Sequence, residues 1–159
     1  MSSLKKVTQK GFTIVELLIV IVVIGILAAL VITTYNGIQQ KGRDTERETD
    51  LKALQGQLEA YYAQKGAYPA EDQLGATSAT NLTFIASDMK GLDKEALRDP
   101  KHTALTYELA AAPAANVYSY EATQADGTTA CTLAALDCAK YKLTATKEGG
   151  GTIVLNSLN

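Results

Sequence analysis

The feature that most constrains this chain is a long apolar run near its N-terminus, at residues 12–32. The run holds 21 residues, and only Thr13, Glu16 and Gly25 interrupt its apolar character. At about 1.5 Å per residue, a helix of this length crosses the roughly 30 Å hydrocarbon layer of a membrane. A helix is required there, because lipid offers no partner to an unpaired backbone amide or carbonyl. The run therefore predicts one membrane-spanning helix.

Basic residues flank this run unequally. Positive charge close to a spanning helix favours the cytoplasmic side of the membrane. We therefore expect the N-terminus in the cytoplasm and everything after about Tyr35 on the outer side. The flanking basic residues are Lys5, Lys6 and Lys10 before the run, and Lys41 and Arg43 after it.

Other interpretations of the run are a secretory signal, a core helix and a plain membrane anchor. A secretory signal would have a shorter apolar region of about 7 to 15 residues, and Ala28-Ala29-Leu30 offers only a poor cleavage site. A core helix would carry a polar face, which this run lacks. A plain anchor fits the length but leaves Glu16 unexplained, although a carboxylate at the centre of a spanning helix costs on the order of 2.5 kcal/mol or more. Glu16 is therefore a candidate functional residue.

The residues around Glu16 form a recognisable pattern. It begins with Lys10-Gly11-Phe12-Thr13, a hydrophobic pair, Glu16 and Leu17-Leu18-Ile19-Val20-Ile21, and continues with Gly25-Ile26-Leu27-Ala28-Ala29-Leu30 and Tyr35. This pattern resembles the class III signal of type IV pilins and of the related pseudopilins of type II secretion systems. The resemblance covers residues 10–35 closely and the helix after them more loosely.

The resemblance implies a processing and assembly route. A prepilin peptidase would cut between Gly11 and Phe12 on the cytoplasmic side, and the new Phe12 amine would be N-methylated. Glu16 would pair with the Phe12 amine of a neighbouring subunit as the helices leave the bilayer for a filament core. The implied partners are copies of this chain, the prepilin peptidase, and the assembly platform and motor components of a pilus. No enzymatic activity, catalytic residue, cofactor or metal is implied.

The helix is expected to continue beyond the apolar run, with one weak region. Many pilins carry a proline at the position of Thr33, and residues 33–37 here, with β-branched residues and an Asn-Gly pair, still favour local melting. Residues 38–50 interleave positive and negative charges, which indicates a solvated helical spacer with pairs such as Glu48 with Lys52. The alternative is that these charges set the register between neighbouring subunits.

A change of pattern then marks where a globular domain packs on the helix. Apolar residues recur three and four apart, which predicts one buried helical face. Gly66 and Pro69 follow and predict the end of the helix, so a continuous helix would cover residues 12–65. The apolar residues of this face are Leu51, Leu54, Leu58, Tyr61 and Tyr62.

The remaining residues, 67–159, are enough for one small domain that completes its core against the helix. Residues 70–115 are mixed, with a short helix expected at 92–98. Alternation of apolar and polar residues predicts half-buried antiparallel strands at 117–122 and 140–146, and a third at 153–155 after a Gly149-Gly150-Gly151 turn. The predicted fold class is α+β, a long N-terminal helix packed against a small antiparallel sheet. The predicted division is 1–11 leader, 12–34 membrane or filament-core helix, 35–66 amphipathic helix and 67–159 globular domain.

Cys131 and Cys138 are the only cysteines, and they lie in the part predicted to be outside the cytoplasm. Two thiols in an oxidising place usually pair, and a metal site is the alternative. The resemblance favours a disulfide that staples a loop between strands, as in many pilins. Some pseudopilins bind calcium near such loops, but Asp126 and Asp137 alone fall short of the six to eight oxygen ligands that calcium takes.

The charge balance bears on nucleic acids. A net charge of −2, from 15 basic and 17 acidic residues, argues against a general nucleic-acid binder. A local basic face at Lys140, Lys142 and Lys147 is the alternative, because some pilus systems take up DNA. His102, the only histidine, is expected to be a loop residue.

These features favour a prepilin whose mature form is the repeating subunit of a type IV pilus. It would be a single-pass membrane protein before assembly and part of an extracellular filament on the cell surface afterwards. The alternatives are a pseudopilin of a type II secretion system, a minor pilin, and a bitopic membrane protein that presents an extracellular binding domain. The last of these would not be cleaved after Gly11.

Overall fold

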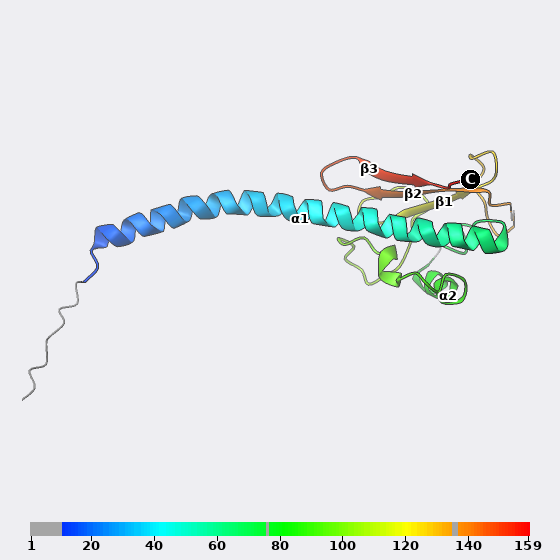
Figure 1. Ribbon diagram of the computed structural model, residues 1–159, viewed down its shortest axis with the longest axis horizontal. Coiled ribbons are helices and arrows are strands. Elements are labelled where there is room, and N and C mark those ends of the chain that lie inside the picture. The colour runs from blue at the N-terminus through cyan, green and yellow to red at the C-terminus, as the bar shows by residue number, and fades with distance from the viewer. Residues whose placement is uncertain (1–10, 76, 135–136) are drawn as a thin grey trace, which may run out of the picture. The chain divides into compact units, whose positions relative to one another are not determined.

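The computed structural model of the chain describes residues 11–75, 77–134 and 137–159 (Figure 1). Helix α1 (Ile14–Lys65) is continuous, and the chain divides into two compact units, Met1–Gln39 and Gln40–Asn159. The expected helix over 12–65 is thus confirmed to within two residues at its start. The second unit also contains α2 (Ser78–Asp88), the 3-10 helix η1 (Lys94–Leu97), and strands β1 (Ser119–Thr123), β2 (Lys140–Thr146) and β3 (Thr152–Asn156).

The three strands form one antiparallel sheet in the order β1-β2-β3. Tyr120 lies opposite Leu143 on β2, and Leu143 lies opposite Leu155 on β3. The β2–β3 hairpin closes with a hydrogen bond of 3.0 Å from the Lys147 amide to the Gly151 carbonyl. Gly150 and Gly151 have φ of 93° and 83°, which glycine adopts without a steric cost. The predicted glycine turn, and with it the predicted α+β fold, is confirmed.

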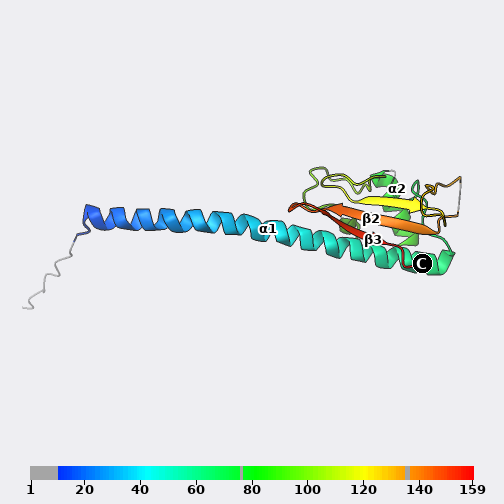
Figure 2. The same cartoon turned by 90° about the horizontal axis from the view of Figure 1, so that it is seen from above.

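The core of the second unit lies between α1 and the sheet, which run side by side in Figures 1 and 2. Leu51, Leu54 and Leu58 of α1 are completely buried, as the three-and-four spacing predicts. Burying one such side chain stabilises by about 1.5–3 kcal/mol. From the sheet and its flanks the core receives Tyr118, Tyr120, Ala122, Tyr141, Leu143 and Ala145.

Glu59 of α1 fastens the end of the chain to this core. Its carboxylate accepts hydrogen bonds from the hydroxyls of Tyr68 and Tyr141, at 2.9 and 2.8 Å, and from the Leu158 amide at 3.2 Å. Burial, together with the Glu59 carboxylate, raises the pKa of Tyr68 to about 12, so this hydroxyl remains a donor at physiological pH. One carboxylate therefore joins α1, β2 and the C-terminal segment.

Two sequence expectations for this unit are corrected. Helix α2 lies in a stretch expected to be merely mixed, and Thr77 caps it by accepting a hydrogen bond from the Thr80 amide at 3.2 Å. The strands are also not half-buried throughout, because Ser119 and its cross-strand partner Thr144 are buried as well. The short helix expected at 92–98 is confirmed as η1.

Candidate functional site

The residues expected at the cleavage point lie just before α1. Gly11, Phe12 and Thr13 belong to no helix or strand, and the Phe12 side chain is 89% exposed. Among the described residues other than its chain neighbour, none has an atom within 4 Å of the place where Gly11 would carry a Cβ. The peptide bond between Gly11 and Phe12 is therefore open to an approaching partner. Lys5, Lys6 and Lys10 of the expected leader lie outside the described residues.

Thr13 and Glu16 cap the start of α1 reciprocally. The Thr13 hydroxyl accepts a hydrogen bond from the Glu16 amide at 3.2 Å. In return, the Glu16 carboxylate accepts from the Thr13 amide at 2.8 Å and from the Thr13 hydroxyl at 2.6 Å. This arrangement satisfies two donors that a helix start would leave unpaired. Sequence reasoning missed the role of Thr13, although the spacing Thr-x-x-Glu before an apolar run is the signature of this cap.

Removing the Thr13 hydroxyl should loosen this first turn. We expect Thr13→Val to cost about 1 kcal/mol of local helix stability, as helix N-caps typically do, so that the Glu16 amide exchanges its hydrogen roughly fivefold faster. The measurement is hydrogen exchange of the full chain in detergent micelles. Thr13→Ser, which keeps the hydroxyl, is the matched control and should exchange as the native chain does. Equal rates in all three proteins would contradict the cap.

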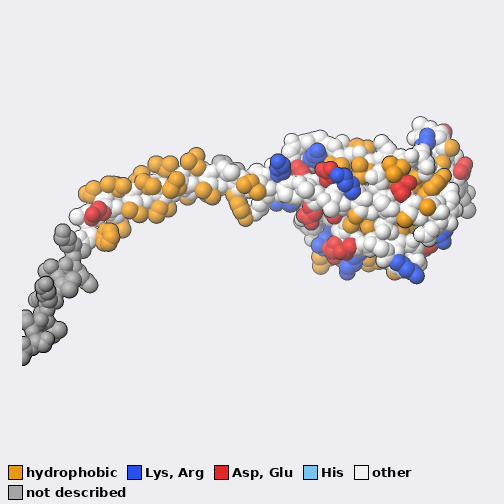
Figure 3. Space-filling model, viewed as in Figure 1, with side chains coloured by type: hydrophobic (Ala, Val, Ile, Leu, Met, Phe, Trp, Pro, Cys, Tyr) orange, Lys and Arg blue, Asp and Glu red, His pale blue; other side chains and the backbone are white. Residues whose placement is uncertain are grey.

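Beyond this cap, the N-terminal part of α1 presents apolar side chains on all sides. None of the membrane-span window within α1 is buried, and by length and composition the helix can cross a bilayer. Figure 3 shows the resulting hydrophobic surface along this unit. No charged residue occurs between Glu16 and Lys41. Glu16 is thus the sole carboxylate of this surface, and it lies at its N-terminal end.

The helix does not break at residues 33–37, where the sequence favours local melting. All five residues belong to α1, and the Thr34 hydroxyl donates to the Leu30 carbonyl at 3.1 Å. Such a bond to the preceding turn occupies a polar group that would otherwise face lipid.

The interpretation of residues 38–50 as a solvated spacer is wrong for the residues that face the sheet. Arg47 is completely buried, and its guanidinium donates to both carboxylate oxygens of Asp99, at 2.6 and 2.9 Å. It also donates to Asp44 at 2.7 Å and to Glu148 at 3.2 Å. The complete set, here called the Arg47 network, consists of Arg43, Asp44, Arg47, Asp99, Lys101 and Glu148.

Glu148 brings the β2–β3 hairpin into this network. Its carboxylate accepts from Arg43 at 2.8 Å and lies 3.3 Å from the ammonium of Lys101. The hydrogen bond from Arg43, opposed by burial and assisted by Lys101 and Arg47, lowers the pKa of Glu148 to about 2 from an ordinary value of 4.5. Its contribution to stability is therefore fully present above pH 4.5 and is lost as the pH falls toward 2. By contrast, Glu48 and Lys52 form the expected exposed pair at 2.7 Å.

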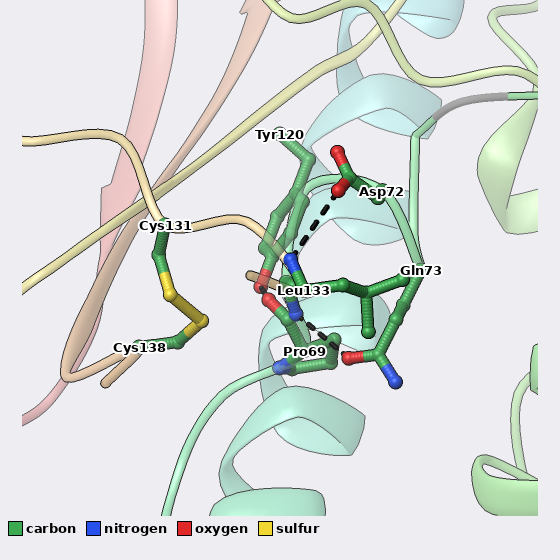
Figure 4. The surroundings of a disulfide bond; sticks show 8 residues. Pro69, Asp72, Gln73, Tyr120, Cys131, Leu133 and Cys138 are labelled. Atoms are coloured by element: carbon green, nitrogen blue, oxygen red, sulfur yellow. Dashed lines mark hydrogen bonds between the residues drawn. A yellow bond between two sulfur atoms is a disulfide. The ribbon is translucent and has the colours of Figure 1, made fainter. Parts of the chain in front are cut away.

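Cys131 and Cys138 form a disulfide within the connection from β1 to β2, with their Cα atoms 5.4 Å apart (Figure 4). The predicted pairing is confirmed. The bridge holds the connection against the segment after α1, because the Tyr68 amide donates to the Cys138 carbonyl at 2.8 Å and the Glu71 amide to the Cys131 carbonyl at 3.1 Å. Nearby, the Leu133 amide donates to Asp72 at 3.3 Å.

Removing this bridge should destabilise the second unit without unfolding it. Closing a ring of this size contributes about 2.5 kcal/mol on the loop-entropy model. We therefore expect the double variant Cys131→Ser, Cys138→Ser to melt about 5–10 °C lower than the native chain. Tyrosine near-ultraviolet circular dichroism in detergent follows the transition. Reductant should lower the melting midpoint of the native chain by the same amount and leave that of the variant unchanged. If the double variant and the reduced native chain both melt at the temperature of the oxidised native chain, the bridge does not stabilise the unit.

The other candidate residues serve local structure. Asp126 accepts from the Thr128 and Thr129 amides at 3.0 and 2.9 Å, which closes a turn. His102 is hydrogen-bonded to the Asn116 carbonyl and to the Thr106 hydroxyl. Within residues 11–75, 77–134 and 137–159, no three His, Cys, Asp or Glu side chains are grouped as metal ligands would be, and Asp137 joins no such group.

Of the three lysines considered for DNA, one is ion-paired and the other two lie at opposite ends of β2. Lys142 pairs with Glu121 across the sheet at 2.8 Å. Lys140 begins β2 and Lys147 follows its end, so the length of a seven-residue strand, about 20 Å, separates them.

A comparison with known proteins finds a family motif near the N-terminus and several similar proteins. Residues 6–32 match the family model of the prokaryotic N-terminal methylation motif. Over 75 residues the chain is 37% identical to fimbrial protein EcpC of Eikenella corrodens, covering 47% of this chain and 49% of that protein. Over 69 residues it is 39% identical to type II secretion system core protein G of Dickeya chrysanthemi, covering 43% and 45%.

A third relative is the type IV major pilin protein PilA of Myxococcus xanthus. It is 39% identical over 60 residues, which cover 38% of this chain and 27% of that protein. The chain thus spans about half the length, or less, of these curated relatives. No solved structure matches the chain.

Proposed function

Because this chain belongs to the superfamily of type IV pilins and type II secretion pseudopilins, we propose that its mature form is the repeating subunit of a type IV pilus. Whether the filament is a pilus or a pseudopilus, the chain is a pilin-like subunit and therefore a structural protein rather than an enzyme. The observation that carries the proposal is the start of α1, where one carboxylate is held in the first turn of an exposed apolar helix.

Processing would occur at the exposed segment before the helix. A prepilin peptidase cuts between Gly11 and Phe12, removes residues 1–11 and leaves the apolar helix in the membrane. Gly11 suits this step because it offers no side chain where the peptidase must approach the backbone. The Phe12 amine is then N-methylated, which the family model that spans residues 6–32 supports.

Assembly would use the carboxylate of Glu16. The cationic Phe12 amine of a neighbouring subunit approaches this carboxylate as the helix leaves the bilayer, so that both charges are neutralised away from water. The reciprocal cap supports this order of events, because it supplies Glu16 with two donors before the neighbour arrives. Residues 12–34 then form the filament core and residues 35–66 the amphipathic half of the helix, while residues 67–159 form the filament surface.

The proposed location follows the same two stages. Before assembly the chain spans the membrane once, with its N-terminus in the cytoplasm. After assembly it is part of an extracellular filament on the cell surface. Copies of the chain, the prepilin peptidase, and the platform and motor of the pilus are its partners.

The pilus proposal can be separated from the pseudopilus alternative by assembly in two hosts. One host has a type IV pilus system without its own major pilin, and the other has a type II secretion system without its own major pseudopilin. We expect this chain to give filaments that can be sheared from the surface of the first host and to leave secretion defective in the second. Restored secretion without filaments would favour the pseudopilin. If the chain gives no filaments and restores no secretion, a minor pilin or a bitopic protein is favoured instead.

A further inference from the structure

Strand β3 forms one edge of the sheet, beside α1 (Figure 2). The Ser157 amide donates to the Tyr141 carbonyl of β2 at 3.1 Å, and the hairpin bond between Lys147 and Gly151 has the same phase. Because antiparallel strands bond through every second residue, the backbone groups of β3 that bond to β2 alternate with groups that point away from the sheet. The residues whose amides and carbonyls point away are Thr152, Val154 and Asn156.

Most of these outward backbone groups have no partner in the chain. Gln55 of α1 donates to the Asn156 carbonyl at 2.8 Å. Within residues 11–75, 77–134 and 137–159, no hydrogen bond is formed by the amides and carbonyls of Thr152 and Val154 or by the Asn156 amide. All three residues are exposed. The edge therefore presents amides and carbonyls with the repeat of a β-strand, and the ligand that matches this repeat is another extended polypeptide.

The opposite edge of the sheet, by contrast, is covered by the chain itself. The Ala110 amide donates to the Tyr118 carbonyl at 2.8 Å, and the Ala110 carbonyl accepts from the Tyr120 amide at 3.0 Å. Proteins usually protect an open edge with charged side chains, proline or a β-bulge. Strand β3 has none of these, because its residues are uncharged, it contains no proline, and its register with β2 is unbroken. An edge without such protection indicates a partner strand.

The side chains at this edge define the strand that fits it. Val154 is 44% exposed at the centre of β3, and a β-branched or other apolar residue opposite it would cover it. Lys147 lies in the hairpin just beyond the Thr152 end of β3. Its ammonium forms no ion pair in the part of the chain that the structure describes, and Glu48, on which it acts at longer range, is paired with Lys52 at 2.7 Å. An antiparallel partner would end near Lys147, so a carboxylate at its C-terminal end would be complementary in charge.

We propose that the free edge of β3 binds an extended segment of another protein, which adds to the sheet as a further antiparallel strand. The backbone of this segment bonds to the outward groups of Thr152, Val154 and Asn156. The segment has an uncharged, β-branched or apolar residue opposite Val154 and a carboxylate near Lys147. The edge lies wholly in the second unit, so this binding does not depend on the proposed assembly, and either can fail without the other.

The probe is the synthetic heptapeptide KYKLTAT, which copies strand β2 and ends in a free carboxylate. In the register that β2 has with β3, Thr144 lies opposite Val154 and Thr146 lies opposite Thr152. The same register on the free side of β3 places a β-branched residue opposite Val154 and the peptide's carboxylate near Lys147.

Binding is measured by NMR of the isotope-labelled full chain in dodecyl maltoside micelles, as the peptide concentration is raised. We expect saturable shifts of the backbone amide signals of Thr152, Val154 and Asn156. The amides of Ile153 and Leu155, which already bond to β2, should shift less.

N-methylated peptides test whether backbone hydrogen bonds hold the partner. A methyl group on the peptide amide that copies Thr144 removes a bond to Val154, and binding should weaken at least fivefold, since one hydrogen bond contributes about that factor. A methyl group on the amide that copies Ala145, which points away from β3, should leave binding unchanged. A C-terminal carboxamide should weaken binding to the native chain about twofold and leave binding to Lys147→Gln unchanged.

Two variants of the chain test the same edge. Val154→Pro removes the outward amide and no bond to β2, because proline is tolerated where the amide of an edge strand faces away from the sheet. We expect Val154→Pro to weaken binding at least fivefold and Val154→Thr, which keeps the amide and the β-branch, to bind as the native chain does. Circular dichroism checks the fold. If Val154→Pro does not fold, the two N-methylated peptides decide the question on the native chain.

Four results would overturn the proposal. The first is no saturable binding of the unmodified peptide, and the second is equal binding of the two N-methylated peptides. The third is a set of shifts centred on β1, which would mean that the peptide replaces β2. The fourth is a native chain that is dimeric in micelles without peptide and becomes monomeric in Val154→Pro, which would make this edge an interface between two copies of the chain.

Discussion

Glu16→Ala is expected to yield a chain that is inserted and cleaved normally but forms less than about one hundredth of the native amount of filament. The cleaved Phe12 amine would be left without a carboxylate in the filament core, and leaving one partner of a buried ion pair uncompensated costs about 3–5 kcal/mol. Each 1.4 kcal/mol is a factor of ten in association. The measurement compares sheared filaments with total processed subunit in a host that has the assembly machinery.

The control for this variant separates the charge of Glu16 from its role in the helix cap. Glu16→Gln keeps an oxygen that can accept from the Thr13 amide but removes the negative charge. We expect filaments to be lost in Glu16→Gln as well. Normal filament yield from Glu16→Gln would mean that Glu16 acts only as a cap, and normal yield from Glu16→Ala would contradict its part in assembly altogether.

Arg47→Ala is expected to produce the largest loss of stability in the second unit. The substitution leaves Asp99 buried without the guanidinium that donates to both of its oxygens. It also removes the ion pairs of Arg47 with Asp44 and Glu148. Removing one partner of such a buried pair costs about 3–5 kcal/mol. We therefore expect the melting midpoint in detergent to fall by about 10 °C or more, or the unit to fail to fold.

Two variants of α1 make this expectation specific. Arg47→Lys keeps the charge but cannot reproduce the two parallel hydrogen bonds to Asp99, so it should be destabilised to a smaller degree. Lys52→Ala removes the exposed pair with Glu48 and should change the stability by no more than about 0.5 kcal/mol. If Arg47→Ala melts within a degree of Lys52→Ala, the buried network does not stabilise the fold.

The sequence was sufficient for those features whose cause is local. The apolar run predicts the exposed first half of α1, because a helix that packs by one side on a small domain would carry a polar face. The spacing of Leu51, Leu54 and Leu58 predicts the buried face, and three glycines predict the β2–β3 turn. The disulfide was predictable as a pairing, since the chain contains only two cysteines.

Features that depend on distant partners could not be predicted in the same way. Arg47 lies among alternating charges, and its burial depends on Asp99, 52 residues away, and on Glu148 in the hairpin. Glu59 likewise acquires its role from Tyr141 and the C-terminal segment. Helix α2 was missed for another reason, because its serine and threonine residues have modest helix propensity, and the cap at Thr77 defines its start.

The candidate site shows the same division between local and distant causes. Gly11, Phe12 and Glu16 were found from their order in the sequence. The cap by Thr13 was missed, but it could have been predicted from the spacing between Thr13 and Glu16. A cleft in the second unit, lined among others by Gln40, Asn116 and Lys147, could not be found in this way, because these residues come from three separate parts of the chain.

The central claim is that this chain is a prepilin, and the intact mass of the membrane-extracted protein tests it most directly. The chain is expressed with an active prepilin peptidase, and a matched sample carries Gly11→Val to block the close approach of the peptidase. We predict that the native chain loses residues 1–11, begins at Phe12 and carries one added methyl group, while the variant remains uncut. A native chain that stays uncut, beside a control prepilin that the same peptidase cleaves, would contradict the claim and favour a membrane-anchored domain of another kind.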